Sequence, residues 1–197
     1  MAKKHRAVWA SLSINGENEM KVKNTSIHYG LVAILFHWIM AIWVIGLVIA
    51  GLYMVYGEKS AAHTLISTWH KEWGLLLLVF VVARLLWRLS NVTPSLDFVS
   101  CLERLAARGI QRMFYILLFA MPISGWLMKS AEGHLPSFFG LFVMPALLKP
   151  NEHLAGQFFT IHKWLAYALI ATFLLHVGGA VKHHFINKDD TLKRMWL

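Results

Sequence analysis

Four histidines lie inside or at the edges of long apolar stretches of the sequence: His37, His70, His162 and His176. An ionisable side chain is costly in a membrane-like environment, so each of these positions is a candidate for function. His162 and His176 are 14 residues apart, close to four helical turns. One helix would present both on nearly the same face, about 21 Å apart along its axis. A single helix would then contribute one imidazole to each of two separate sites.

The other two histidines match these positions in depth. His37 lies about six residues after the start of the first apolar stretch, and His176 lies about as many residues before the end of the last stretch. His70 and His162 both lie near the opposite ends of their stretches. The depths therefore predict two pairs, His37 with His176 and His70 with His162. Ligation of haem iron by one histidine from each of two facing helices fits this arrangement.

Other roles for these histidines stay open on spacing alone. A histidine within a membrane helix is often a hydrogen-bonding partner between helices. A zinc site is less favoured, because each pair provides only two histidine ligands, with no cysteine or carboxylate nearby. A proton pathway would lack a relay, since no Asp or Glu lies within an apolar stretch; Glu72 lies only at an edge.

The elements that would carry the histidines are four apolar stretches, at about residues 31–55, 65–89, 110–128 and 158–181. Hydrophobic residues make up 57% of the 197 residues and charged residues 15%, against roughly 45–50% and 25% in soluble domains. Each stretch approaches the roughly 20 residues that cross a bilayer. We therefore predict an all-α membrane protein, a bundle of four transmembrane helices. A single cysteine excludes a disulfide framework and a cysteine-ligated cluster.

The basic residues predict the orientation of this bundle. With four spans, both termini and residues 91–108 lie on one side of the membrane, and that side collects 14 of the 19 lysines and arginines. Under the positive-inside rule both termini are cytoplasmic. The net charge of +9 is thus assigned to the membrane surface rather than to nucleic acid. On the other side, residues 129–157 are predicted to form a loop resting at the membrane interface.

The polar N-terminal segment differs from the rest of the chain. Residues 1–25 lack a periodic apolar pattern, and we predict a disordered extension there. Residues 26–197 would form the transmembrane domain. Met20 stands just before Lys21 and Lys23, so a start at Met20 would leave a short basic lead-in to the first helix.

Several short motifs resemble the bacterial cytochrome b561 family, four-helix di-haem quinone oxidoreductases that include superoxide oxidase. The resemblance covers about Ser26 to Met195. Its strongest part is the tail, with Leu175-His176, Lys182-His183-His184-Phe185 and Lys188-Asp189-Asp190-Thr191-Leu192-Lys193-Arg194-Met195. The remaining motifs are Phe36-His37-Trp38, His70-Lys71-Glu72-Trp73-Gly74, Val82-Ala83-Arg84-Leu85-Leu86-Trp87-Arg88-Leu89, Met121-Pro122-Ile123-Ser124-Gly125, Phe139-Gly140-Leu141, Met144-Pro145 and Ile161-His162-Lys163.

This resemblance implies two b haems, with His37 and His176 as axial ligands of one iron and His70 and His162 of the other. It also implies a multi-pass protein of the bacterial inner membrane and ubiquinone as substrate near the cytoplasmic haem, at His183. His183 is seven residues beyond His176. At the outer face the expected partner is superoxide or a periplasmic redox protein, and Lys71 and Lys163 lie beside the outer histidines. No catalytic residue is assigned beyond these.

Two alternatives remain beside a quinone-linked oxidoreductase. The chain can be an electron-transfer subunit of a membrane enzyme complex, or, less favoured, a haem-free membrane carrier with structural histidines. Arg84 and Arg88, four residues apart, can pair with haem propionates or anchor the helix at the cytoplasmic surface. Gly74 and Gly179 share helix faces with His70 and His176, and we expect them to leave room for a porphyrin.

Overall fold

The computed structural model describes residues 22–97 and 99–196. Four long helices dominate it: α2 (Leu31–Tyr56), α3 (Ala61–Leu89), α4 (Cys101–Ala131) and α5 (Glu152–Lys182). A short hairpin of β1 (Ser137–Phe138) and β2 (Phe142–Val143) separates α4 from α5. A π-helical turn (His183–Asn187) and a 3-10 turn (Lys193–Met195) follow α5. The prediction of a disordered extension over residues 1–25 falls almost wholly outside the described residues.

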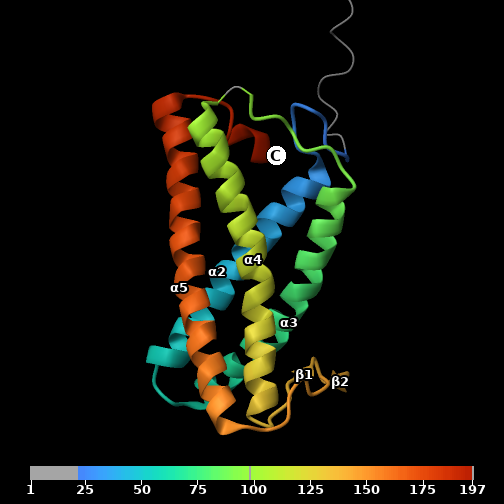
Figure 1. The fold of residues 1–197 in the computed structure, drawn as a ribbon, viewed down its shortest axis with the longest axis vertical. Helices are drawn as coiled ribbons and strands as arrows, with labels where there is room; N and C mark the ends of the chain where they lie inside the picture. Colours follow the sequence, from blue (N-terminus) through green and yellow to red (C-terminus); the bar gives the residue numbers. More distant parts are fainter. Residues whose placement is uncertain (1–21, 98, 197) are drawn as a thin grey trace, which may run out of the picture.

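The long helices run along the longest axis of the molecule and alternate in direction (Figure 1). α4 and α5 pack side by side, and α2 packs on α3. The start of α2, the connection from α3 to α4 and the C-terminus share one end of the bundle, while the hairpin lies at the opposite end. We call these the terminal end and the hairpin end.

Three of the four helices are long and apolar enough to cross a membrane: α2, α4, and α5 with its π-helical turn. α3 has a similar length of 29 residues, and its charged residues Lys71, Glu72, Arg84 and Arg88 are spread along the helix. The prediction of a helical membrane protein is thus confirmed at this coarser level. Membrane crossing by all four helices and the orientation of the termini stay predictions.

Three helices, α3, α4 and α5, begin earlier than their apolar stretches indicate, and the difference is larger for α4 and α5 than for α3. α4 starts at Cys101 because Ser100 and Glu103 form a capping box, in which the Ser100 side chain accepts from the Glu103 backbone N–H. α5 starts at Glu152 because the Asn151 side chain accepts from the Leu154 backbone N–H. The expected polar connection over 91–108 is therefore shorter, since its second half is helical.

The hairpin within residues 129–157 was not predicted. Ser137 pairs with Val143 and Phe138 with Phe142. Between the strands, Phe139 and Gly140 both adopt positive φ angles, of 51° and 72°. A tight turn of this kind requires the left-handed region that glycine tolerates best.

The buried core lies midway along the bundle. It consists of six side chains from all four helices: Met40, Leu77, Val81, Leu117, Leu118 and Leu169. Leu169 is seven residues from both His162 and His176, so the core separates the two histidine levels. Many other apolar side chains, such as Ile42 at 70% exposure, face outward, as expected for a surface in contact with lipid.

Candidate functional site

The first histidine pair lies toward the terminal end of the bundle. α2 presents His37 and α5 presents His176, and their ring centroids are 6.0 Å apart. Phe114 of α4 packs edge-on against His176, with centroids 5.4 Å apart. Trp38 flanks His37 at 5.3 Å. We call His37 and His176 the inner pair.

The second pair lies toward the hairpin end. α3 presents His70 and α5 presents His162, with ring centroids 6.3 Å apart. A cavity of 240 Å³ opens beside them, lined by both histidines, by Gly51, Gly74 and Gly125, and by apolar side chains. We call His70 and His162 the outer pair. The structure thus brings together the same two pairs that depth predicts.

The spacing within each pair suits one metal ion between two imidazoles. Metal–imidazole nitrogen bonds are about 2.0 Å long, and the nitrogen lies roughly 1.2 Å from its ring centre, so two opposed ligands place their centroids about 6.4 Å apart. The separations of 6.0 and 6.3 Å are close to this value. Direct hydrogen bonding between two imidazoles would bring the rings closer to each other than a metal ion does.

A buried hydroxyl fixes the tautomer of His162. Ser124, 5% exposed, donates its single proton to the Met121 carbonyl at 2.8 Å. Its oxygen also lies 2.9 Å from His162 Nδ1. Since the Ser124 proton is already committed, Nδ1 must donate, and Nε2 keeps a free lone pair. A metal-ligating histidine needs this tautomer, held by a hydrogen bond at the other nitrogen.

The His70 ring is held from the side of α2. It makes a hydrogen bond to the backbone of Leu47, and its Cε1 and Nδ1 are the atoms nearest to Gly51. A hydrogen bond at one ring nitrogen leaves the other nitrogen as the ligand atom. His70, the free Nε2 of His162 and the adjoining cavity would together hold a group such as haem.

Two glycines make room for the outer pair. A Cβ atom at Gly51 would lie 3.3 Å from His70 Cε1, and one at Gly125 would lie 3.3 Å from His162 Cε1. Neither was singled out from the sequence for this contact. The spacing in the sequence could have indicated Gly51, because Gly51 is 14 residues after His37 and therefore lies on the same face of α2.

The two glycines expected to accommodate a porphyrin have open surroundings. A Cβ atom at Gly74 or at Gly179 would meet nothing within 4 Å among the described residues. Gly74 lines the cavity beside the outer pair. Both positions thus keep open space beside the helix backbone, and their role toward a porphyrin stays a prediction.

Lys71 and Lys163 also line the cavity of the outer pair. Each follows an outer histidine in sequence, so two positive charges lie at the edge of this site. Arg84 and Arg88 of α3 lie at the other level, with their Cζ atoms 6.0 and 5.8 Å from the centre of the Tyr115 ring. These distances allow cation–π contacts.

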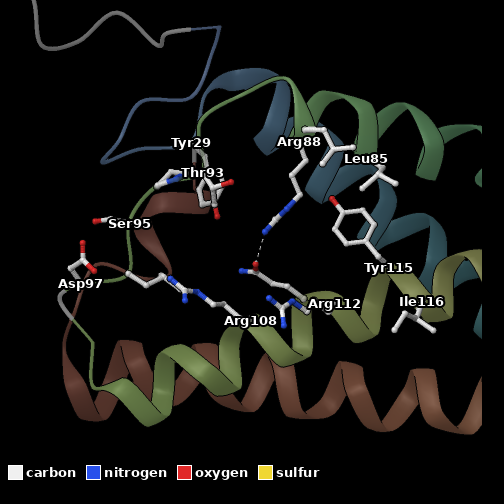
Figure 2. A pocket seen from close by; sticks show the side chains of 14 residues that line it. Tyr29, Leu85, Arg88, Thr93, Ser95, Asp97, Arg108, Arg112, Tyr115 and Ile116 are labelled. Atoms are coloured by element: carbon white, nitrogen blue, oxygen red, sulfur yellow. Dashed lines mark hydrogen bonds between the residues drawn. The ribbon is translucent and has the colours of Figure 1, made fainter.

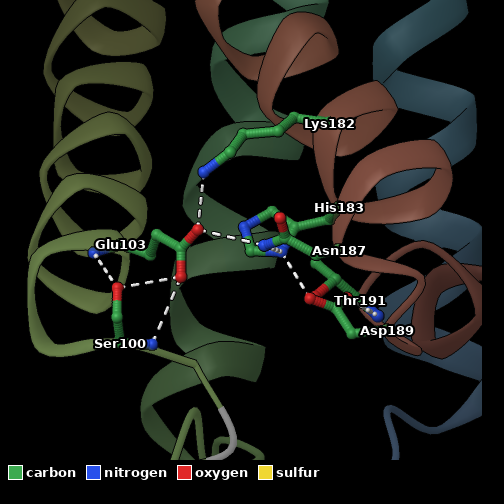
Figure 3. A network of polar contacts seen from close by, with 7 residues as sticks. All are labelled: Ser100, Glu103, Lys182, His183, Asn187, Asp189 and Thr191. Carbon is green, nitrogen blue, oxygen red and sulfur yellow. Dashed lines mark hydrogen bonds and ion pairs between the residues drawn. The ribbon is translucent and has the colours of Figure 1, made fainter.

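His183, the predicted quinone contact, lies in a polar network at the terminal end (Figure 3). Its Nδ1 is 2.6 Å from Asp189 Oδ2, and its side chain is 14% exposed. Although burial favours the neutral acid, hydrogen bonds from Thr191 and His183 lower the pKa of Asp189 below its ordinary value of 3.8. The ionised carboxylate can only accept, so Nδ1 carries a proton and Nε2 is left for another partner.

The same network joins the ends of two helices. Glu103 of α4 accepts from Lys182 at 2.6 Å and from Asn187 at 3.0 Å, both through Oε1, while Oε2 accepts from Ser100 at 2.9 Å. Figure 3 shows Glu103 reaching across to the chain that follows α5. The sequence gives no signal for these contacts, because Glu103 and Lys182 are far apart in the chain.

Comparison with known proteins agrees with this architecture. The family model described as "Prokaryotic cytochrome b561" matches residues 28–197. The chain is 40% identical to "Cytochrome b561 homolog 2" of Escherichia coli (strain K12) over 178 residues, which cover 89% of this chain and 95% of the relative. It is 30% identical to "Cytochrome b561 homolog 1" of the same strain over 167 residues, 82% and 93% of the two chains. It is 32% identical to "Probable superoxide oxidase CybB" of Yersinia pestis over 128 residues, 64% and 72% of the two chains.

Proposed function

We propose, from the premise that this chain belongs to the prokaryotic cytochrome b561 family, that it carries two b haems, one held by the inner pair and one by the outer pair. Membership makes it a membrane-bound cytochrome that binds haem b and transfers electrons. The observation that carries the proposal is the spacing of 6.0 and 6.3 Å within two separate histidine pairs. Bound haem would supply a one-electron carrier at each level.

We further propose that the terminal end faces the cytoplasm of a bacterium and that the bundle crosses the inner membrane. Six basic residues lie in the halves of α3, α4 and α5 that are nearer the terminal end: Arg84, Arg88, Arg104, Arg108, Arg112 and Lys182. The positive-inside rule supports this orientation. The inner pair then lies toward the cytoplasm and the outer pair toward the outer face.

Quinone is the substrate that we propose at the terminal end, with His183 as its contact. His183 lies seven residues beyond His176, about 10 Å along the helix axis. Asp189 holds Nδ1 of the ring, which supports a role for Nε2 toward a quinone carbonyl. An imidazole there can donate a hydrogen bond and deliver a proton as the quinone is reduced.

Superoxide is the one-electron donor that we propose at the outer face. Two observations support it: Lys71 and Lys163 line the outer cavity, and a relative is named as a probable superoxide oxidase. Positive charge beside a cavity attracts a small anion. In the overall reaction, two superoxide anions lose one electron each and leave as O2, and one quinone gains two electrons and two protons to become a quinol.

The test uses the purified holoprotein, enzymatically generated superoxide and a short-chain ubiquinone. We expect one quinol for every two superoxide anions consumed, and no quinol when superoxide dismutase is added. Replacing Lys71 and Lys163 by glutamine should slow this reaction and weaken its dependence on ionic strength. Lys59→Gln with Lys149→Gln is the matched control, since these lysines do not line the cavity.

Reduction of the haems by a quinol, without any superoxide-dependent quinol formation, would contradict superoxide as the donor. The outer face would then serve a redox protein. A purified protein with no haem absorbance would contradict the di-haem proposal itself.

A further inference from the structure

A second cavity, of 820 Å³, lies at the terminal end between α3, α4 and the connection that joins them (Figure 2). Its size is within the range of ligand pockets in proteins, about 300–1,000 Å³. Neither histidine pair lines it, and neither does His183. Because three arginines line it, Arg88, Arg108 and Arg112, we call it the arginine cavity.

The positive charge in the arginine cavity is not neutralised by the protein. Arg88 reaches from α3 into the cavity (Figure 2). Its guanidinium donates to the side-chain oxygen of Gln111 on α4, a neutral amide, at 3.0 Å. The side chains of Arg108 and Arg112 make no hydrogen bond or ion pair within the described part of the chain. Asp97 is the acidic residue of the lining, and Arg104 already binds its Oδ1 at 3.0 Å.

Further donors face the same space. Tyr29 and Tyr115 contribute hydroxyl groups to the lining. Burial raises the pKa of Tyr29 above 10.0, against the opposing effect of Arg88, so its hydroxyl remains a donor at neutral pH. Guanidinium groups with nearby hydroxyl donors are the usual partners of phosphate oxygens.

Arg108 and Arg112 do not face the inner histidine pair. Phe114 marks the side of α4 that packs on His176. Arg112 lies two residues before Phe114, which places it about 200° away around the helix. Arg108 lies about one turn before Arg112 and is therefore on the same side of α4 as Arg112. The haem that we propose at the inner pair would therefore lie on the opposite side of α4 from Arg108 and Arg112. We do not expect its propionates to pair with these two arginines.

The remaining wall of the cavity is apolar and reaches the outer surface of the bundle. Leu85, Leu89 and Ile116 line it, and Leu89 and Ile116 are 74% and 61% exposed. Figure 2 places Leu85 and Ile116 on the side away from Arg108 and Asp97. A ligand here would meet cations at one side and a lipid-facing surface at the other, as an amphiphile with an anionic head does.

We propose that the arginine cavity binds a phosphate group, and that an anionic membrane phospholipid carries it, with its head at Arg88, Arg108 and Arg112 and its chains along Leu89 and Ile116. The apolar wall favours a lipid over a free phosphate ion, which would leave that wall unused. This site is independent of the quinone and superoxide assignments. It would fasten α3 to α4 at the end where the hydrogen bond from Arg88 to Gln111 joins them.

The experiment measures binding of three probes to detergent-purified holoprotein by native mass spectrometry: dioctanoyl phosphatidylglycerol, dioctanoyl phosphatidylcholine and inorganic phosphate. The test variant is Arg108→Gln with Arg112→Gln. The matched control is Lys23→Gln with Lys188→Gln, which removes two exposed charges outside the cavity lining. We expect phosphatidylglycerol to bind more tightly than phosphatidylcholine, and its Kd to rise at least tenfold in the test variant only. Haem content should stay at the wild-type value in both.

Arginine-dependent binding of inorganic phosphate, with no preference for phosphatidylglycerol, would keep the phosphate site but reject a lipid as its source. Equal Kd values in the test and control variants for every probe would overturn the proposal. Loss of haem, or of haem reduction by quinol, in the test variant would also overturn it, because the arginines would then belong to the electron-transfer site. If the double variant does not fold, Gln111→Glu provides the same test, since it places a carboxylate against Arg88 without changing the side-chain shape.

Discussion

Replacing Ser124 with alanine should weaken haem binding at the outer pair and leave the inner pair unchanged. The Ser124 oxygen accepts from His162 Nδ1 at 2.9 Å, and Ser124 is 5% exposed. Without it, the ring keeps only its hydrogen bond to the Met121 backbone, and the neutral ring can more readily place its proton on Nε2, where the metal must bind. Loss of a hydrogen bond that orients a ligand costs about 10- to 100-fold in metal affinity. This range corresponds to roughly 1.4–2.8 kcal/mol.

The assay is haem transfer to an excess of an apo-globin acceptor, followed by absorbance. Wild type should release its two haems in two kinetic phases, and in Ser124→Ala the phase of the outer haem should accelerate by about tenfold or more. Thr172→Ala is the matched control. It also removes a buried hydroxyl that donates to a helix carbonyl, at Ala168, but within the described residues no hydrogen bond joins Thr172 to a histidine.

Two results would refute this reasoning. Release of haem from Ser124→Ala with wild-type kinetics would show that the hydrogen bond does not select the ligating tautomer. The other contradicting result is acceleration of haem release by Thr172→Ala to the same extent as by Ser124→Ala. That outcome would assign the effect to lost packing or helix stability rather than to His162.

The remaining predictions concern one glycine and one carboxylate. Gly125→Ala places a Cβ atom 3.3 Å from His162 Cε1, so the ring must shift, and the number of haems per protein should fall toward one. Gly46→Ala is the control: its Cβ atom meets nothing within 4 Å among the described residues, and this variant should retain two haems. Asp189→Ala removes the hydrogen bond that holds the His183 ring, so stopped-flow reduction of the haems by quinol should slow by about tenfold, or 1.4 kcal/mol in the barrier, with oxidation by a soluble oxidant unchanged. The pKa of Asp189 is lowered in the folded protein. Its ionised carboxylate therefore stabilises the fold at pH values well above 3.8, and this stabilisation is lost as the pH falls through the pKa of the folded state. The difference in Tm between wild type and Asp189→Ala should therefore stay constant near neutral pH and narrow below pH 3.8.

Much of the histidine arrangement follows from the sequence because helical geometry is regular. The 14-residue spacing of His162 and His176 fixes their common face, and the ends of the apolar stretches fix their depth. Pairing of each with a histidine on another helix then needs only the alternating direction of the helices. These are properties of whole elements, so errors of a few residues at helix ends do not disturb them.

The features that sequence reasoning missed depend on local polar contacts or on the approach of one helix to another. The early start of α4 depends on hydrogen bonds between Ser100 and Glu103, which lie outside the apolar pattern. The contact of Gly125 with His162 depends on the distance between α4 and α5, which no periodicity reports. The arginine cavity likewise arises where Arg88 of α3 lies near Arg108 and Arg112 of α4, beside the connection that joins the two helices.

The most direct test of the di-haem proposal is haem quantification in the four single variants His37→Ala, His70→Ala, His162→Ala and His176→Ala. Each should bind one haem instead of two. His70→Ala and His162→Ala should lose the same spectroscopic signal, and His37→Ala and His176→Ala should lose the other, because each pair shares one iron. Retention of two haems in His162→Ala or His176→Ala, or loss of the same signal in both of these α5 variants, would contradict the proposal.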